Sequence, residues 1–216
     1  MPREFGKAWF SMYTDEDFAN QPIGDKWLYS VLVGQPALNY AGLQPINMRR
    51  WRRAMRDDGA MPSERDIQQR LVRMESRGYV FTDDDTGEVL VRSFMRSDKI
   101  VDQPNVFKSA LRDLTHVESP KLAAVLLTEI ERLGEPKVTT ATPAGQKLRA
   151  AIDALRVDAI AHLEDITEGI TEPFPKPFAE GLEEPFPEGI SEGLTRPGKT
   201  EPLPEPFAEP LRDGSV

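Results

Sequence analysis

Residues 63–77 hold the side chains whose types and spacing are best suited to specific chemistry. Ile67, Leu71 and Met74 recur at i, i+4 and i+7, a pattern that predicts an amphipathic helix with one apolar face. On the opposite face, arginines can donate two hydrogen bonds to guanine, and glutamines can form bidentate pairs with adenine. The alternative is a solvated polar face, which most surface helices have. The candidate base-contacting residues are Ser63 (which also suits a helix cap), Arg65, Gln68, Gln69 and Arg73.

A second basic cluster precedes this helix, in the sequence MRRWRRAMRDDG at residues 48–59. Asn47 suits a helix cap, and Met48, Trp51 and Met55 are spaced to face a core, so we expect Trp51 to be buried rather than stacked on a base. Arginines on the remaining surface suit phosphate contacts, which set affinity and salt dependence rather than sequence preference. Alternatively, nearby acidic residues balance them on a solvated surface. The candidate phosphate-contacting residues of this cluster are Arg49, Arg50, Arg52 and Arg53.

A β-hairpin is predicted directly after residues 63–77. Residues 79–82 and 89–94 are rich in β-forming side chains, and the sequence DDTG between them supplies turn residues. An acidic turn repels a phosphate backbone, so either Arg92 and Arg96 beside it contact phosphates or the hairpin faces a protein. The segment DDDTGE lacks the ligand spacing and flanking helices of an EF-hand, which favours a hairpin turn over a calcium loop.

Charge is distributed unevenly along the 216 residues, whose net charge is −9. From residue 164 onward there are 13 acidic and 4 basic residues, so this segment alone carries −9, and residues 1–163 hold 23 of each sign. Between Arg49 and Arg77, nine arginines stand against five acidic residues. The basic excess therefore coincides with the two candidate helices, where a nucleic-acid partner requires it.

The composition argues against several classes of protein. Cysteine is absent, which excludes disulfide scaffolds and thiolate chemistry and suits a reducing compartment. Only His116 and His162 offer imidazole, and neither a GxxxxGK nor a GxGxxG phosphate loop occurs, so we expect no enzyme, metal site or cofactor. The N-terminus lacks the apolar core of a signal peptide, and no apolar run approaches about 18 residues. We therefore expect a cytoplasmic protein, within a bacterial host, that does not enter the membrane.

The order of predicted elements defines the fold class. Within residues 25–96 the order is helix, strand, helix, helix, strand, strand, with Asp25 as the first helix cap and residues 37–43 as the first strand. This order is typical of an α+β winged helix-turn-helix in a mainly α chain. The predicted parts are an N-terminal arm or short strand (1–24), the winged helix-turn-helix domain (25–96), a helical extension (97–134), a linker (135–143), a long helix (144–165) and a disordered acidic Pro-rich tail (166–216).

The long helix and the tail suggest protein partners. The helix carries a stripe that could pack on the domain or pair with a second copy to form a homodimer: Leu148, Ile152, Leu155, Ala159 and Leu163. Ten of the 19 prolines lie between Pro173 and Pro210, among repeats such as EPFPEGI, and proline at this density opposes helices and sheets. The Phe and Leu side chains spaced through the tail suit docking to a partner, and a purely solubilising tail is the alternative.

Three segments together resemble a known family. They are GDKWLYSVLVGQPALNYAGLQPINMRRW, then ERDIQQRLVRMESRGYVFTDDDTGEVLVRSF, then MRSD followed by QPNVFKSAL. Over about residues 5–133 the chain resembles the winged-helix domains of phage replisome organisers and replication initiators, and the helix-turn-helix proteins of actinobacterial phages and prophages. The resemblance implies sequence-specific binding of double-stranded DNA at an origin or promoter, with the rest of the chain, including the acidic tail, recruiting a replication protein. The acidic hairpin tip departs from the usual DNA-binding wing.

We therefore predict a double-stranded DNA-binding protein of phage replication. The nearest alternative is a phage or prophage transcriptional regulator, which would use the same residues. An alternative from another class is a winged-helix adaptor that binds proteins through its acidic hairpin and tail. The arginine cluster at residues 49–53 discriminates between them, because only the DNA-binding interpretations need its positive charge.

Overall fold

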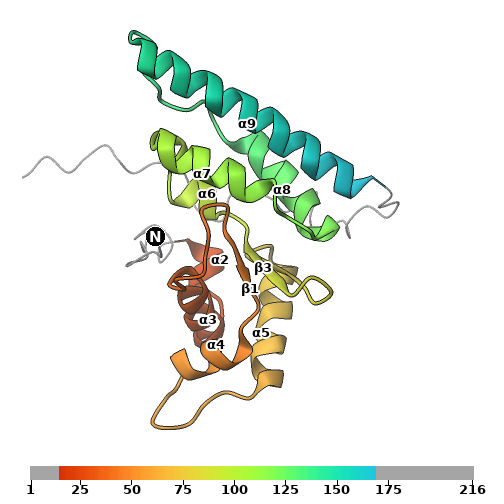
Figure 1. Ribbon diagram of the computed structural model, residues 1–216. Coiled ribbons are helices and arrows are strands. Elements are labelled where there is room, and N and C mark those ends of the chain that lie inside the picture. Colours follow the sequence, from red (N-terminus) through yellow and green to blue (C-terminus); the bar gives the residue numbers. More distant parts are fainter. Residues whose placement is uncertain (1–14, 169–216) are drawn as a thin grey trace, which may run out of the picture.

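The computed structural model describes residues 15–168, which are mainly helical with one small antiparallel sheet (Figure 1). The strand or arm expected at residues 7–13 and nearly all of the Pro-rich tail lie outside the described residues. The helices are α2 (Glu16–Ala19), α3 (Ile23–Val33), α4 (Met48–Ala54), α5 (Glu64–Ser76), α6 (Phe94–Ser97), α7 (Pro104–Leu114), α8 (Pro120–Arg132) and α9 (Pro143–Thr167), with a 3-10 turn η1 (Ile100–Asp102). The strands are β1 (Leu43–Pro45), β2 (Val80–Asp83) and β3 (Glu88–Val91).

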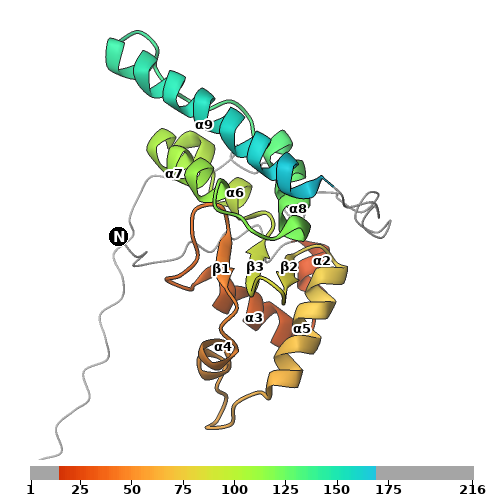
Figure 2. The same cartoon turned by 45° about the vertical axis from the view of Figure 1, so that its right-hand side comes forward.

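The sheet is the middle layer between two groups of helices (Figure 2). Its order is β1-β3-β2, and both pairings are antiparallel. Because successive side chains on a strand point to opposite faces, each strand serves two cores. Leu43, Phe81 and Leu90 pack into a core with α7, α8 and α9. The three valines Val80, Val89 and Val91 pack into the other core with α3, α4 and α5.

The predicted apolar faces of α4 and α5 are confirmed. Ile67, Leu71 and Met74 are buried on α5, and Trp51 and Met55 are buried beside α3 and α5. Trp51 is therefore part of the core, as expected. The polar side chains opposite these buried faces are mostly exposed. Both helices lie on the other side of the sheet from α9 (Figure 1).

Two predicted boundaries of the first elements are wrong. Asp25 does not cap a helix: α3 begins at Ile23, and the Asp25 carboxylate is buried inside its first turn. Residues 37–42 form turns rather than a strand, because Asn39 Oδ1 accepts hydrogen bonds from the backbone N–H groups of Ala41 (3.0 Å) and Leu43 (2.9 Å). The strand begins only at Leu43, after that turn.

The second hairpin strand is also shorter than predicted. β3 ends at Val91, and the expected strand residue Phe94 instead opens helix α6. Gly42 has a φ of +88°, and a Cβ at that position would lie 2.8 Å from the Val91 carbonyl oxygen and 2.9 Å from Phe94 Cβ. This close approach of two chain segments is where the sheet ends, and it requires glycine at position 42.

Helix α9 lies across α7 and α8 (Figures 1 and 2). Its residues Ile152, Ala159 and Leu163 are buried in the core that α7 and α8 line, and Leu148 and Leu155 are partly buried there. The stripe on which the homodimer prediction depended is therefore occupied within the chain. Of its two predicted uses, packing on the domain is the one observed.

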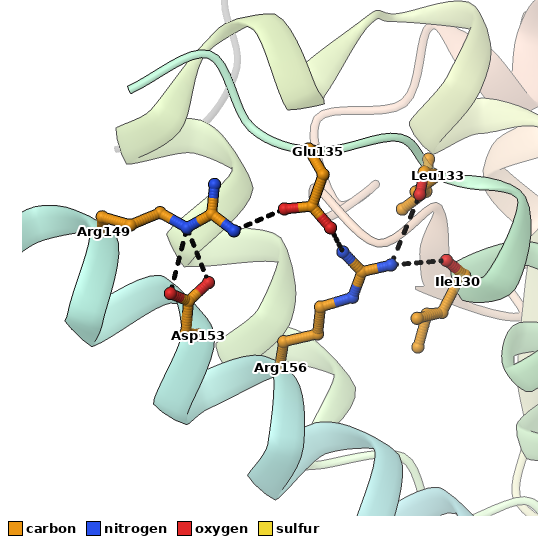
Figure 3. Close-up of polar contacts among 6 residues, drawn as sticks. All are labelled: Ile130, Leu133, Glu135, Arg149, Asp153 and Arg156. Carbon is orange, nitrogen blue, oxygen red and sulfur yellow. Dashed lines mark hydrogen bonds and ion pairs between the residues drawn. The ribbon is translucent and has the colours of Figure 1, made fainter. Parts of the chain in front are cut away.

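Polar contacts hold the start of the linker against α9 (Figure 3). Arg156 donates to the backbone carbonyls of Ile130 and Leu133 at 3.3 Å each, which satisfies carbonyls at the C-terminal end of α8. Glu135 forms ion pairs with Arg149 and Arg156. The linker predicted at residues 135–143 contains no helix or strand before α9 begins at Pro143. Its first residue, Glu135, is held to α9 by the two ion pairs.

Candidate nucleic-acid interface

The outward face of α5 is the centre of the candidate interface. Ser63 accepts a hydrogen bond from the Asp66 backbone N–H (3.1 Å), and Asp66 accepts one from the Ser63 backbone N–H (2.9 Å), which closes a capping box. The Ser63 hydroxyl also donates to Asp66 at 2.7 Å, and this bond is the main reason that the pKa of Asp66 is lowered. The structure gives the Ser63 hydroxyl the capping role that its position also suggested, and its contact with bases stays a prediction.

Arginines anchor α5 to the start of α3. Arg73 donates two hydrogen bonds to Asp25, from Nε at 2.8 Å and from Nη2 at 2.7 Å. Asp25 is only 2% exposed, so this carboxylate requires its partner. Arg70 Nη1 donates to the Gly24 carbonyl at 2.9 Å. The guanidinium of Arg73 is thus held by a buried carboxylate while its side chain stays 48% exposed, and its contact with bases stays a prediction.

Three predicted base-contacting side chains remain available on α5. Arg65, Gln68 and Gln69 are exposed, and within residues 15–168 they make no hydrogen bond or ion pair. They line a shallow hollow together with Val72 and the edge of Arg73. Such a surface offers guanidinium and amide donors and acceptors to a partner without breaking an internal contact.

Val72 is the residue of this face that sequence reasoning missed. It is 67% exposed, between the polar side chains of the hollow and away from the core. The sequence did contain a signal for it: position 72 lies outside the i, i+4, i+7 stripe of Ile67, Leu71 and Met74, which places its side chain on the exposed face of the helix. An apolar side chain on a predicted polar face suits contact with an apolar group of a partner.

The arginines of α4 lie on the exposed side of that helix. Arg49, Arg50 and Arg53 are exposed and have no ion pair among the described residues. Arg52 is partly buried, where it donates to the Pro62 carbonyl at 2.8 Å and to Glu64 at 2.9 Å. Three of the four predicted phosphate-contacting arginines are thus free for an outside partner, while Arg52 joins α4 to the start of α5.

The connection between α4 and α5 contains a tight turn of its own. Asp57 and Ala60 form an isolated antiparallel bridge, and Asp58 and Gly59 between them have φ values of +43° and +80°. Two positive φ values are typical of a two-residue hairpin turn. Gly59 therefore lies at the tip of this turn, five residues after α4 ends at Ala54.

Arg92 and Arg96 cannot contact phosphates in this structure. Arg92 is 3% exposed, and its Nε lies 3.6 Å from Glu129 Oε1. Arg96 Nε donates to Glu129 Oε2 at 2.8 Å, and Arg132 lies 3.5 Å from the same carboxylate. Burial lowers the pKa of Arg92, and the negative charge of Glu129 opposes that shift. The predicted phosphate contacts of these two arginines are replaced by a buried ion cluster with α8.

The hairpin of β2 and β3 faces its own chain. The Ser119 hydroxyl, which caps α8, donates to Asp83, and Lys121 Nζ donates to the Thr82 carbonyl at 2.7 Å. Lys121 also pairs with Glu75 on α5. The hairpin therefore packs on α8 of its own chain, and its contact with a partner protein stays a prediction.

The remaining titratable groups form no second site in the described part of the chain. Each histidine lies against a backbone carbonyl: His162 Nε2 is 2.9 Å from Val117 O, and His116 Nδ1 is 2.8 Å from Arg112 O. Residues 15–168 contain no group of three carboxylate, imidazole or thiol side chains arranged to hold a metal ion. Over the same residues, no helix has both the length and the hydropathy to cross a membrane.

Comparison with known proteins found no match among protein-family models, curated proteins or solved structures. The α4–α5 surface carries the exposed guanidinium groups of Arg49, Arg50, Arg53 and Arg65 together with the amides of Gln68 and Gln69 and the exposed Val72.

Proposed function

We propose that residues 25–96 form a winged helix-turn-helix and that the protein binds double-stranded DNA through α5. The order α3, β1, α4, α5, β2, β3 and the antiparallel order β1-β3-β2 support this fold assignment. In such domains the second helix of the pair enters the major groove, which accommodates one α-helix. Here that helix is α5.

One observation carries the proposal. Arg65, Gln68 and Gln69 are exposed on α5 and are bound to nothing in the described chain, while the arginines beside them are tied to α3. These are the side-chain types that pair bidentately with guanine and adenine. The free guanidinium groups of Arg49, Arg50 and Arg53 on α4 supply the phosphate contacts that duplex binding needs.

In this proposal the β2–β3 hairpin, which is the wing of the domain, does not contact DNA. Because the β2–β3 hairpin is packed on α8, and Arg92 and Arg96 after it are paired with Glu129, DNA binding depends on α4 and α5 alone among the described elements. The acidic turn residues Asp84 and Asp85 stay exposed and repel phosphates. Major-groove contacts are therefore expected, without a wing contact to the neighbouring minor groove.

The biological setting follows from the resemblance described above. We propose that the bound DNA is a phage origin, and that the tail recruits a replication protein. Regulation of transcription would use the same surface, and the position of the gene beside a helicase or primase gene would favour replication.

The test uses the full chain and fluorescently labelled duplexes cut from phage and host genomes, with binding measured from 50 to 200 mM salt. We expect one fragment to be retained specifically, with affinity falling steeply as salt rises. The slope of log affinity against log salt is negative, and the triple variant Arg49→Ser, Arg50→Ser, Arg53→Ser should make it shallower by about 2–3. The reason is that about 0.9 counterion is released per phosphate contact.

A matched triple variant controls for net charge. Arg112→Ser, Lys137→Ser and Lys147→Ser remove three exposed cations from α7, the linker and α9, and should leave the salt slope unchanged. Equal effects of the two triples would show that only overall charge matters. Failure of the unmodified chain to bind any duplex at 50 mM salt would overturn the proposal and favour the protein-adaptor alternative.

A further inference from the structure

Val72 adds an apolar group to the α5 surface, where the arginine and glutamine side chains offer only polar groups. A single exposed apolar side chain is common on protein surfaces and needs no explanation by itself. Val72, however, lies one helical turn beyond Gln68 and Gln69 on the same outward stripe, and all three line one hollow. A valine at this place offers methyl groups to whatever the two amides bind.

The neighbouring anchor limits how far the contact surface extends. Arg73 follows Val72 directly, and its guanidinium is turned onto Asp25 of α3. Of the residues that line the hollow, Arg65 is the first, and Val72 is the last before Arg73, whose guanidinium is already bound to Asp25. Seven residues of helix span about 10 Å, which corresponds to about three base-pair steps of duplex DNA.

Only one base carries an apolar group in the major groove. Thymine presents its C5 methyl there, and the adenine paired with it presents the N6 and N7 atoms that a glutamine binds bidentately. An A·T pair thus satisfies a glutamine and a valine that lie side by side. Guanine, which suits Arg65, would lie at the other edge of the face.

We propose that Val72 is a specificity-determining residue that contacts a thymine methyl group, beside adenine contacts made by Gln68 or Gln69. This inference rests on the proposed function and deepens it, because it names the base pair that this part of α5 prefers. Burial of one methyl group is worth about a fourfold change in affinity.

The test removes the methyl group from the DNA and from the protein separately. A high-affinity duplex is first selected with the full chain from a randomised library, and each thymine in it is then replaced singly by deoxyuridine, which keeps the base pairing and lacks only the C5 methyl. For the unmodified chain, one replacement should weaken binding about fourfold. Val72→Ala should weaken binding to the thymine duplex by a similar factor and should no longer distinguish thymine from deoxyuridine at that position.

The chain offers a closely matched control. Val157 on α9 is also 67% exposed and helical, and it lies outside the candidate interface. Val157→Ala should therefore behave as the unmodified chain on both duplexes. Circular dichroism should show that both variants retain the helical content of the unmodified chain, since alanine favours helices at exposed positions.

Two outcomes overturn the inference and differ in what they leave standing. If the chain binds a selected duplex but the effects of Val72→Ala and of every deoxyuridine replacement are additive, the thymine contact is wrong and DNA binding remains. If the chain binds no duplex at 50 mM salt, both proposals fail, and the hollow is left to a protein partner.

Discussion

Arg65 and Arg73 show how two identical side chains on one helix face acquire different roles. The two arginines are eight residues apart on α5, and both lie outside its apolar stripe. Asp25 lies against Arg73, and the two side chains share two hydrogen bonds shorter than 2.9 Å. Arg65 has no such partner among the described residues. The difference is decided by α3, whose Asp25 lies 48 residues before Arg73 in the chain.

This difference makes a prediction at the scale of single residues. Arg73→Ala should lower the free energy of unfolding by about 1–3 kcal/mol, because it leaves the buried Asp25 carboxylate without its donors. Arg65→Ala should leave the stability unchanged and weaken binding to the selected duplex by a factor of about 5–150, the range of one bidentate base contact. Urea denaturation and fluorescence anisotropy measure the two effects. Normal stability of Arg73→Ala combined with lost DNA binding would return Arg73 to the base-contacting set.

At the scale of elements, the sheet and α8 are joined by opposite charges. Glu129 is 1% exposed and lies within 3.6 Å of side chains from Arg92, Arg96 and Arg132. Because Arg92 and Glu129 are both nearly fully buried, removal of the carboxylate would leave the Arg92 guanidinium in the interior without this opposite charge. The contact also explains why α8 covers the hairpin, since it ties the end of β3 to the middle of that helix.

Removal of this carboxylate should therefore be severe. Glu129→Gln keeps the shape of the side chain, removes its charge and should lower the free energy of unfolding by about 3–5 kcal/mol. Glu131→Gln, two residues along on the exposed side of α8, should change stability by less than about 0.5 kcal/mol. Urea denaturation of both variants at neutral pH measures the difference. Equal stabilities would mean that the cluster contributes nothing to the packing of α8.

At the scale of the whole molecule, two hydrophobic cores share one sheet. Val89 faces the core with α3 and α5, and its neighbour Leu90 faces the core with α7 and α8. The predicted boundary between residues 96 and 97 consequently separates elements that cover opposite faces of the same strands. Removal of the helical extension would expose Leu43, Phe81 and Leu90, so we expect the two parts to unfold together.

Buried tyrosines make this stability sensitive to alkali. Burial raises the pKa of Tyr29 to about 12, although Ser93 and two nearby arginines act in the opposite direction. Burial also raises the pKa of Tyr79. A phenol that stays neutral in the folded state contributes stability that is complete below the unfolded pKa of about 10 and is lost as the pH rises through the folded pKa.

Stability should therefore fall between pH 10 and pH 12, and Tyr29 should account for about 2–3 kcal/mol of that loss. Tyr29→Phe has no ionisable group at this site, so its free energy of unfolding should decline less steeply than that of the unmodified chain. Urea denaturation between pH 8 and pH 11 follows the difference. Parallel curves for the two proteins would show that Tyr29 ionises equally easily in the folded and unfolded states.

Elements whose signals are local could be predicted from the amino-acid sequence alone. The periodicity of Ile67, Leu71 and Met74 and the cap at Ser63 depend on residues within a few positions of one another, and both predictions are confirmed. The order of helices and strands in residues 25–96 followed from the same local signals. The face of α5 that carries Arg65, Gln68 and Gln69 was also correct, because helical spacing alone fixes which side chains oppose the apolar stripe.

Only the tertiary structure decided which charges are available to a partner. Arg73, Arg92 and Arg96 look like surface arginines in the sequence, and each is bound to a carboxylate from a distant element: Asp25 in the first case and Glu129 in the others. The stripe of α9 likewise became internal because α7 and α8 lie beneath it. Contacts between distant elements determine which carboxylate pairs with an arginine and which surface covers an apolar stripe, and local residue spacing does not encode them. The candidate interface could therefore be limited to α4 and α5 only from the folded structure.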